Sequence, residues 1–140
     1  MFILDTNVIS EIRKIRLGRA DKNVAQWAEG VDSVDLYLSA ITVQELEMGV
    51  LLAERRNPPQ GAVFRAWFES LVLPAFAGRI LPIDTAVAKR SAALHVPAPR
   101  PVIDTLIAAT ALVHGMTVVT RNVAYFQSAG VSLLNPWEAH

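Results

Sequence analysis

The 140-residue sequence contains no cysteine. This absence excludes disulfides, thiolate metal sites and cysteine nucleophiles, and it suits a cytoplasmic protein. The charge shows no excess of either sign, with 13 basic and 13 acidic residues, so it does not indicate nucleic-acid binding, although a local basic patch would be enough. The N-terminus lacks a basic segment before an apolar one, and the uncharged run 105–120 is interrupted by His114 and Gly115. We therefore expect neither a signal peptide nor a membrane span.

Short apolar segments alternate with amphipathic ones along the chain. The length is typical of one domain, residues 1–140. Apolar runs predict strands, and apolar residues three or four positions apart predict helices. Their alternation indicates an α/β fold, with a central parallel β-sheet of four to five strands flanked by α-helices on both faces. The predicted strands are 2–5, 34–40, 79–83, 116–120 and 131–135, and the predicted helices are 7–14, 21–30, 42–56, 60–77, 84–95 and 104–115.

Acidic and polar residues gather where the predicted strands end and the helices begin. In open parallel sheets, ligands bind at the carboxyl ends of the strands, near a switch in strand order. Acids from distant segments would meet at that edge, and a cluster of carboxylates suits a hard cation such as Mg²⁺ or Mn²⁺. Such an ion activates water and stabilises the charge that grows on a phosphate. The positions are Asp5, Ser39, Asp84 and Asn122 after strands, and Glu45 and Asp104 near helix starts.

Each acid also has a simpler explanation as a helix cap. Asp84 and Asp104 precede helical patterns and would be good N-caps, and Thr42 with Glu45 has the spacing of a capping box. Asp5 could cap the helix that follows it. However, a carboxylate at the end of a buried strand is desolvated and needs a partner, which favours a functional role for Asp5.

Three segments carry a more specific signal when they are taken together. They are FILDTNVISE (2–11), SAITVQELEMGV (39–50) and DTLIAATALVHGMTVVTRNVAYF (104–126), and VSLLNPW (131–137) follows them. In order and spacing the chain resembles the PIN-domain ribonucleases known as VapC toxins, particularly the FitB-like branch. The resemblance implies a Mg²⁺- or Mn²⁺-dependent endoribonuclease, the toxin of a toxin–antitoxin pair, which hydrolyses RNA phosphodiester bonds with a metal-activated water.

The resemblance also implies roles for individual residues. Asp5 and Asp104 would ligate the metal directly, and Glu45 would do so directly or through water. Thr6 and Asn7 would shape the first turn, with the Thr6 hydroxyl supporting Asp5. Thr120 would be the polar residue at the end of the fourth strand.

The chain departs from the family at the fourth acidic position. Asn122 and Tyr125 stand where many relatives carry an aspartate. An amide oxygen can still ligate a metal or hold a metal-bound water, but it adds no charge. Whether the site takes one metal or two is therefore open.

Basic residues follow the first motif segment and lie within the third. Arg121 could share the charge that grows on the phosphate, and Arg13 and Lys14 could hold the RNA backbone. The alternative for Arg13 and Lys14, and for Arg16 and Arg19 after them, is an ordinary solvated helix end.

Two other functions fit parts of the sequence. A catalytically degraded PIN-like module that binds protein would explain Asn122 and Tyr125, whereas the retained acids argue against it. An aspartyl-phosphate enzyme would use Asp5 as nucleophile, but Asn7 stands where haloacid-dehalogenase-like phosphatases carry a second aspartate. The resemblance favours the toxin, with a transfer or ribosomal RNA substrate, a VapB-type antitoxin, a homodimer and a cytoplasmic location.

Overall fold

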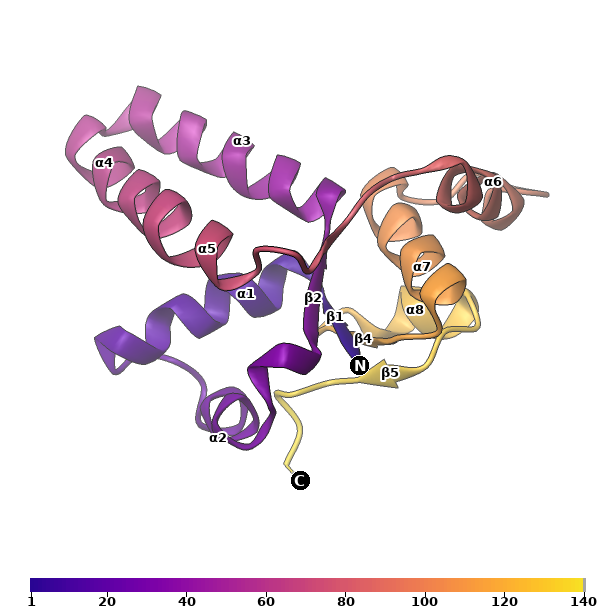
Figure 1. Ribbon diagram of the computed structural model, residues 1–140, viewed down its shortest axis with the longest axis horizontal. Helices are drawn as coiled ribbons and strands as arrows, with labels where there is room; N and C mark the ends of the chain where they lie inside the picture. Colours follow the sequence, from indigo (N-terminus) through magenta and orange to yellow (C-terminus); the bar gives the residue numbers. More distant parts are fainter. Residues whose placement is uncertain (140) are drawn as a thin grey trace.

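A computed structural model describes residues 1–139 as a five-stranded parallel sheet with helices on both sides (Figure 1). This architecture confirms the predicted α/β class. The strand order is β3-β2-β1-β4-β5. The chain therefore moves outward from β1 to β3 and then returns to the other side of β1, which places the switch in strand order between β1 and β4. The strands are β1 (Phe2–Leu4), β2 (Leu36–Ser39), β3 (Ile80–Leu81), β4 (Thr117–Val119) and β5 (Leu133–Leu134).

The helices form two groups on opposite sides of the sheet (Figure 1). One group comprises α1 (Thr6–Arg13), α2 (Lys22–Gly30), α3 (Ala40–Arg56), α4 (Pro58–Trp67) and α5 (Leu73–Ala75), joined by 3₁₀ turns at Lys14–Leu17 and Ser33–Asp35 and by a π-helical segment at Phe68–Val72. The other group comprises α6 (Thr85–Leu94), α7 (Val102–His114) and α8 (Val123–Ser128).

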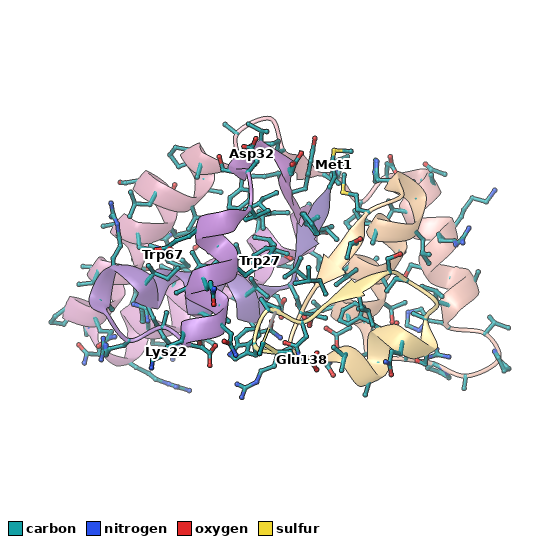
Figure 2. All side chains as sticks on the ribbon, turned by 90° about the horizontal axis from the view of Figure 1, so that it is seen from below. Met1, Lys22, Trp27, Asp32, Trp67 and Glu138 are labelled. Carbon is teal, nitrogen blue, oxygen red and sulfur yellow. The ribbon has the colours of Figure 1, made fainter. Side chains whose placement is uncertain are left out.

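Neighbouring residues of β1 supply the two apolar cores. Leu4 belongs to the core under α1, α3 and α4, whereas Ile3 belongs to the core under α7 and α8. This alternation is expected for a strand that is buried on both faces. Figure 2 shows Trp27 on α2, and its ring meets the Phe2 ring edge-on at 5.9 Å between centroids.

Several helix limits differ from the sequence prediction. Helix α3 begins at Ala40 because the Ser39 hydroxyl accepts the Ile41 N–H at 3.2 Å, so the predicted Thr42–Glu45 capping box is wrong. Helix α7 begins at Val102, which places Asp104 in the first turn and not at the N-cap. By contrast, Asp84 caps α6 as predicted, accepting the Val87 N–H at 3.0 Å.

The sequence prediction missed α8 and the early start of α4. The segment of α8 has six residues, too few for a clear helical repeat. Helix α4 starts at Pro58, two residues earlier than predicted, because proline is well accommodated in the first helical turn. Asn57 accepts the Gln60 N–H at 3.3 Å and so caps this helix.

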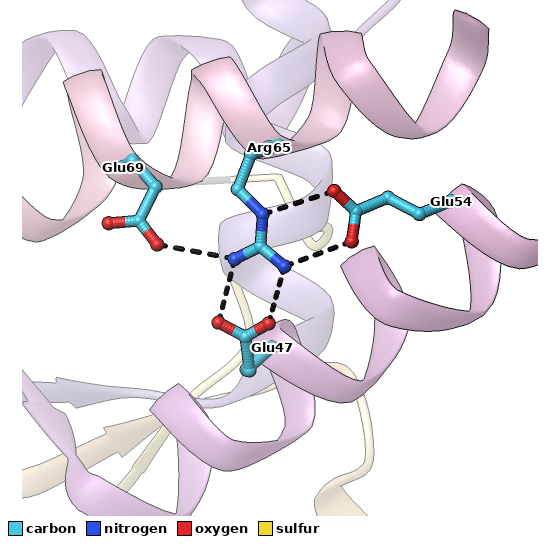
Figure 3. A network of polar contacts seen from close by, with 4 residues as sticks. All are labelled: Glu47, Glu54, Arg65 and Glu69. Atoms are coloured by element: carbon cyan, nitrogen blue, oxygen red, sulfur yellow. Dashed lines mark hydrogen bonds and ion pairs between the residues drawn. The ribbon is translucent and has the colours of Figure 1, made fainter. Parts of the chain in front are cut away.

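Helices α3 and α4 form a hairpin that carries Glu45 toward the sheet. An ion-pair network clamps the hairpin (Figure 3). The Arg65 guanidinium donates to both Glu47 oxygens at 2.7 Å, to Glu54 at 3.1 and 3.3 Å and to Glu69 at 3.2 Å. Bidentate arginine–carboxylate geometry resists sliding of one helix along the other.

Candidate active site

Asp5 lies at the switch point between β1 and β4 and is only 5% exposed. One carboxylate oxygen accepts the Thr6 backbone N–H at 2.8 Å, so Asp5 does cap α1. The other oxygen accepts the Thr120 hydroxyl at 2.7 Å and the Asn7 amide at 3.4 Å. The capping bond occupies only one of the two oxygens, so capping is compatible with a functional role for Asp5.

Glu45 reaches the same edge of the sheet from α3. Its carboxylate accepts a hydrogen bond from the Thr6 hydroxyl, 39 positions away in the sequence. The expectation that this hydroxyl supports Asp5 is wrong: the Thr6 backbone contacts Asp5, whereas the Thr6 side chain contacts Glu45. Thr6 thus links the first acid to the second.

Asp104 joins the group from the first turn of α7. The Asn122 side-chain amide donates to it at 3.3 Å, and the Asn122 backbone N–H donates to the Thr120 hydroxyl at 2.9 Å. Since the Thr120 hydroxyl in turn donates to Asp5, the end of β4 connects Asp104 with Asp5. The structure therefore brings together Asp5, Glu45, Asp104 and their predicted supporting residues.

The site raises the pKa of two of its acids. Burial raises the pKa of Asp5, partly opposed by the hydrogen bonds from Thr120 and Thr6. Burial also raises the pKa of Asp104, and the negative charges of Asp5 and Glu45 raise it further, against the opposing hydrogen bond from Asn122. Crowded carboxylates that resist ionisation are what a cation would relieve.

The donor set fits a hard divalent ion that keeps part of its water shell. Among residues 1–139, no three His, Cys, Asp or Glu side chains converge closely enough to hold a metal ion by themselves. Mg²⁺ often takes only one or two protein carboxylates and completes its octahedron with water. Asp5 and Asp104 would then be the direct ligands, while Glu45, held by Thr6, would act through water.

The predicted cations occupy different surroundings. The exposed Arg121 lies next to Asn122, and its guanidinium carbon is 5.3 Å from the centre of the Trp137 ring. Arg13 is half-buried over the Phe64 ring, at 4.6 Å. Lys14 pairs with Glu11 at 3.2 Å, as at an ordinary solvated helix end.

Two details of the site escaped the sequence prediction. Trp137, which positions Arg121, stands 16 positions away, and no local pattern connects them. The Tyr125 hydroxyl bonds to the Thr105 hydroxyl at 2.7 Å, so Tyr125 braces α7 beside Asp104. Of the two candidates for the fourth acidic position, only Asn122 contacts an acid through its side chain.

None of the helices within residues 1–139 is long and apolar enough to cross a bilayer.

Comparison with known proteins places this arrangement in a family. Residues 2–130 match the PIN domain model. The chain is 43% identical to "VapC ribonuclease Y4jK" of Sinorhizobium fredii, covering 99% of each chain, and 41% identical to "Toxin FitB" of Neisseria gonorrhoeae, covering 98% of this chain and 99% of that one. The crystal structure of FitAcB from Neisseria gonorrhoeae contains a similar chain, with a TM-score of 0.89, 40% identity and 99% coverage of both chains. On these matches, which agree with the resemblance in the sequence motifs, this chain belongs to the PIN domain family.

Proposed function

We propose that the chain, as a single domain over residues 1–140, is an endoribonuclease that acts as the toxin of a toxin–antitoxin pair. One observation carries the proposal: Asp5, at the strand switch, lies within electrostatic reach of an acid on α7, and Thr6 links it to an acid on α3. The ribonuclease and toxin names of full-length relatives support the same activity.

Asp5 and Asp104 would hold a Mg²⁺ or Mn²⁺ ion, with Glu45 holding one of its waters. When bound, the ion supplies an activated water and offsets the charge that grows on the phosphate. Thr120 orients Asp5 and opposes the rise that burial causes in its pKa, because its buried hydroxyl donates to the carboxylate. The Thr6 hydroxyl orients the Glu45 carboxylate.

The remaining polar residues orient the RNA and the ion. Arg121 binds the scissile phosphate, and Trp137 restrains its guanidinium beside the site. Asn7 connects the end of β1 with the end of β4, since its side-chain N–H donates to Asp5 and its side-chain oxygen accepts the backbone N–H of Arg121 at 3.5 Å. Because Asn122 carries no charge, the site would hold one ion, and a second would arrive only with the substrate phosphate.

The natural partners follow from the family. Relatives of known structure include toxin–antitoxin complexes, such as one from Klebsiella pneumoniae that is 27% identical with a TM-score of 0.67. We infer that this chain forms a homodimer, binds a small VapB-type antitoxin and cuts transfer or ribosomal RNA in the cytoplasm. An apolar groove of about 410 Å³ between α1 and the α4–α5 segment, which Arg13, Arg16 and Arg79 also line, offers the antitoxin an apolar binding surface.

Cleavage of total bacterial RNA tests the proposed activity. The purified protein, freed of antitoxin, would be compared with Asp5→Asn and with Asp84→Asn, a matched control because Asp84 is an exposed carboxylate that caps α6 and is not among the groups that shift the pKa of Asp5 or Asp104. We expect discrete cuts with Mg²⁺ or Mn²⁺, none with EDTA or Asp5→Asn, and unchanged cuts with Asp84→Asn.

A different result would favour the degraded binding module. If the folded wild-type protein made no cuts with either ion, the neutral Asn122 would be the first suspect. In that case Asn122→Asp should restore metal binding, which calorimetry measures independently of cleavage.

A further inference from the structure

Two glycines of the α3–α4 hairpin differ in what the fold requires of them. A Cβ added at Gly61 would lie 2.4 Å from the Glu54 Cα, so close helix packing demands glycine there. A Cβ added at Gly49, inside α3, would meet nothing within 4 Å. Glycine weakens a helix relative to alanine, and packing within the described chain gives no compensating reason for Gly49.

Gly49 lines a groove that starts at the acids. A hollow of about 230 Å³ between α1, α3 and α4 includes Thr6 and Glu45 in its wall, and a second hollow of about 450 Å³ reaches the end of the hairpin at Arg56 and Asn57. Gly49 and Phe64 line both hollows, so the two are neighbours. We call this pair of adjacent hollows the hairpin groove.

The chemistry of the hairpin groove suits a polyanion with flat, apolar bases. Beyond Glu45 its walls carry no carboxylate, whereas Arg13, Lys14 and Arg56 are cations. The Arg13 guanidinium stacks over Phe64 at 4.6 Å and Trp67 at 5.9 Å.

Arg13 is also available to a ligand. Within residues 1–139, its guanidinium makes no ion pair and no hydrogen bond, although Arg13 is half-buried. At 3.6 residues per turn, Glu47 and Glu54 fall on roughly the opposite side of α3 from Gly49. The acidic residues that pair with Arg65 accordingly line neither hollow.

We propose that the hairpin groove binds single-stranded RNA beside the cut, with one base seated over Gly49. This inference rests on the proposed nuclease function and identifies where its substrate is held. The smaller hollow is below the roughly 300 Å³ of small-molecule sites and suits one planar base, which stacks against Phe64 and the Arg13 plane. Lys14 and Arg56 meet the flanking phosphates. Gly49 is glycine because any side chain would occupy the seat of the base.

Three variants of the full chain test the proposal. Gly49→Leu fills the seat, Gly49→Ala narrows it, and Gly30→Ala is the matched control, because Gly30 is also helical with open space around its Cα and lines neither hollow. Affinity for a fluorescent single-stranded RNA would be measured in the non-cleaving Asp5→Asn background. Cleavage and melting temperature would be measured without that substitution.

We expect Gly49→Leu to weaken RNA binding at least about tenfold, the loss of one stacked base. Gly49→Ala should melt about 2–3 °C higher and yet cleave more slowly, which a purely structural role for Gly49 would not produce. Gly30→Ala should bind and cleave like the wild type. Arg56→Gln, which removes a cation assigned to a flanking phosphate, should lower the slope of log affinity against log salt by about 0.7.

The proposal is overturned if Gly49→Leu binds and cleaves RNA like the wild type. It is also overturned if Gly49→Leu releases a co-expressed antitoxin but leaves RNA affinity unchanged, because the groove would then be a protein site. Failure of the nuclease function is distinguishable: the wild type would not cleave, while the affinity series would still report on the groove.

Discussion

The Thr120 hydroxyl should contribute more to the free energy of unfolding than an ordinary buried hydroxyl does. It donates to Asp5 at 2.7 Å and accepts the Asn122 N–H at 2.9 Å, and Thr120 is fully buried. Thr120→Val keeps the shape of the side chain and removes both hydrogen bonds, so no cavity confuses the result.

The magnitude follows from the charge on the acceptor. A hydrogen bond to a charged group contributes about 1.5–3 kcal/mol, because a buried carboxylate that loses a donor stays desolvated. For a chain of 140 residues, 1 kcal/mol shifts the melting temperature by about 3–4 °C. We therefore expect Thr120→Val to melt about 5–10 °C lower near neutral pH.

The pH dependence identifies Asp5 as the source of the loss. The Thr120 hydrogen bond lowers the pKa of Asp5 against the larger raising effect of burial, so the variant should have a still higher Asp5 pKa. As the pH falls and Asp5 becomes protonated in the folded state, the bond that was lost becomes an ordinary neutral one of about 0.5–1.5 kcal/mol. The gap between variant and wild type should therefore narrow in acid.

Urea unfolding of the metal-free protein across this pH range is the assay, with metal-dependent cleavage as a second readout. Residues that orient a metal ligand typically contribute 10–100-fold in metal affinity or activity, so cleavage should fall by about that factor. An unfolding gap that stays constant from neutral to acid pH would refute the reasoning, because the lost bond would then not be to a carboxylate.

Three other perturbations give signed predictions. Gly61→Ala should lower the free energy of unfolding by about 1–2 kcal/mol, seen as a lower urea midpoint at an unchanged m-value. Forcing a Cβ against the Glu54 backbone costs more than alanine adds to the stability of the helix. An unchanged midpoint would contradict the close packing. Asp104→Asn should stabilise the metal-free protein at neutral pH. Because the pKa of Asp104 is raised in the folded state, the stability of the wild type falls as the pH rises through that pKa. Urea midpoints measured at acid and neutral pH should therefore show a gain for the variant only at neutral pH. Arg65→Met should lower the melting temperature at neutral pH but not in acid. The Arg65 hydrogen bond lowers the pKa of Glu47, so the contribution of this bond to stability disappears as Glu47 is protonated. Thermal scans at both pH values check this.

The sequence predicted the sheet better than the contacts at its edge. Five apolar runs became five strands, and the central strands β1, β2 and β4 carry a strong apolar signal because they are largely buried. Helix starts were less predictable, since caps compete: Ser39 and Thr42 are both good caps three positions apart, and the end of β2 decided for Ser39.

The partners of each acid could not be read from local patterns. Asp5 and Thr120 stand 115 positions apart, and Thr6 and Glu45 stand 39 apart, so only the strand order brings them together. The resemblance implied that the Thr6 hydroxyl supports its neighbour Asp5, whereas the structure gives this hydroxyl to Glu45. The backbone N–H of Thr6 already occupies the nearer Asp5 oxygen, which leaves its hydroxyl to the acid on α3.

The donors at this edge explain how three acids can share it before any cation binds. Asp5 draws hydrogen bonds from Thr6 and Thr120, Glu45 draws one from Thr6, and Asp104 draws one from Asn122. The Asn122 bond opposes the burial, and the negative charges of Asp5 and Glu45, that raise the pKa of Asp104. A divalent cation would relieve the remaining repulsion, and because only the folded chain assembles the acids, its binding adds directly to the stability of the fold.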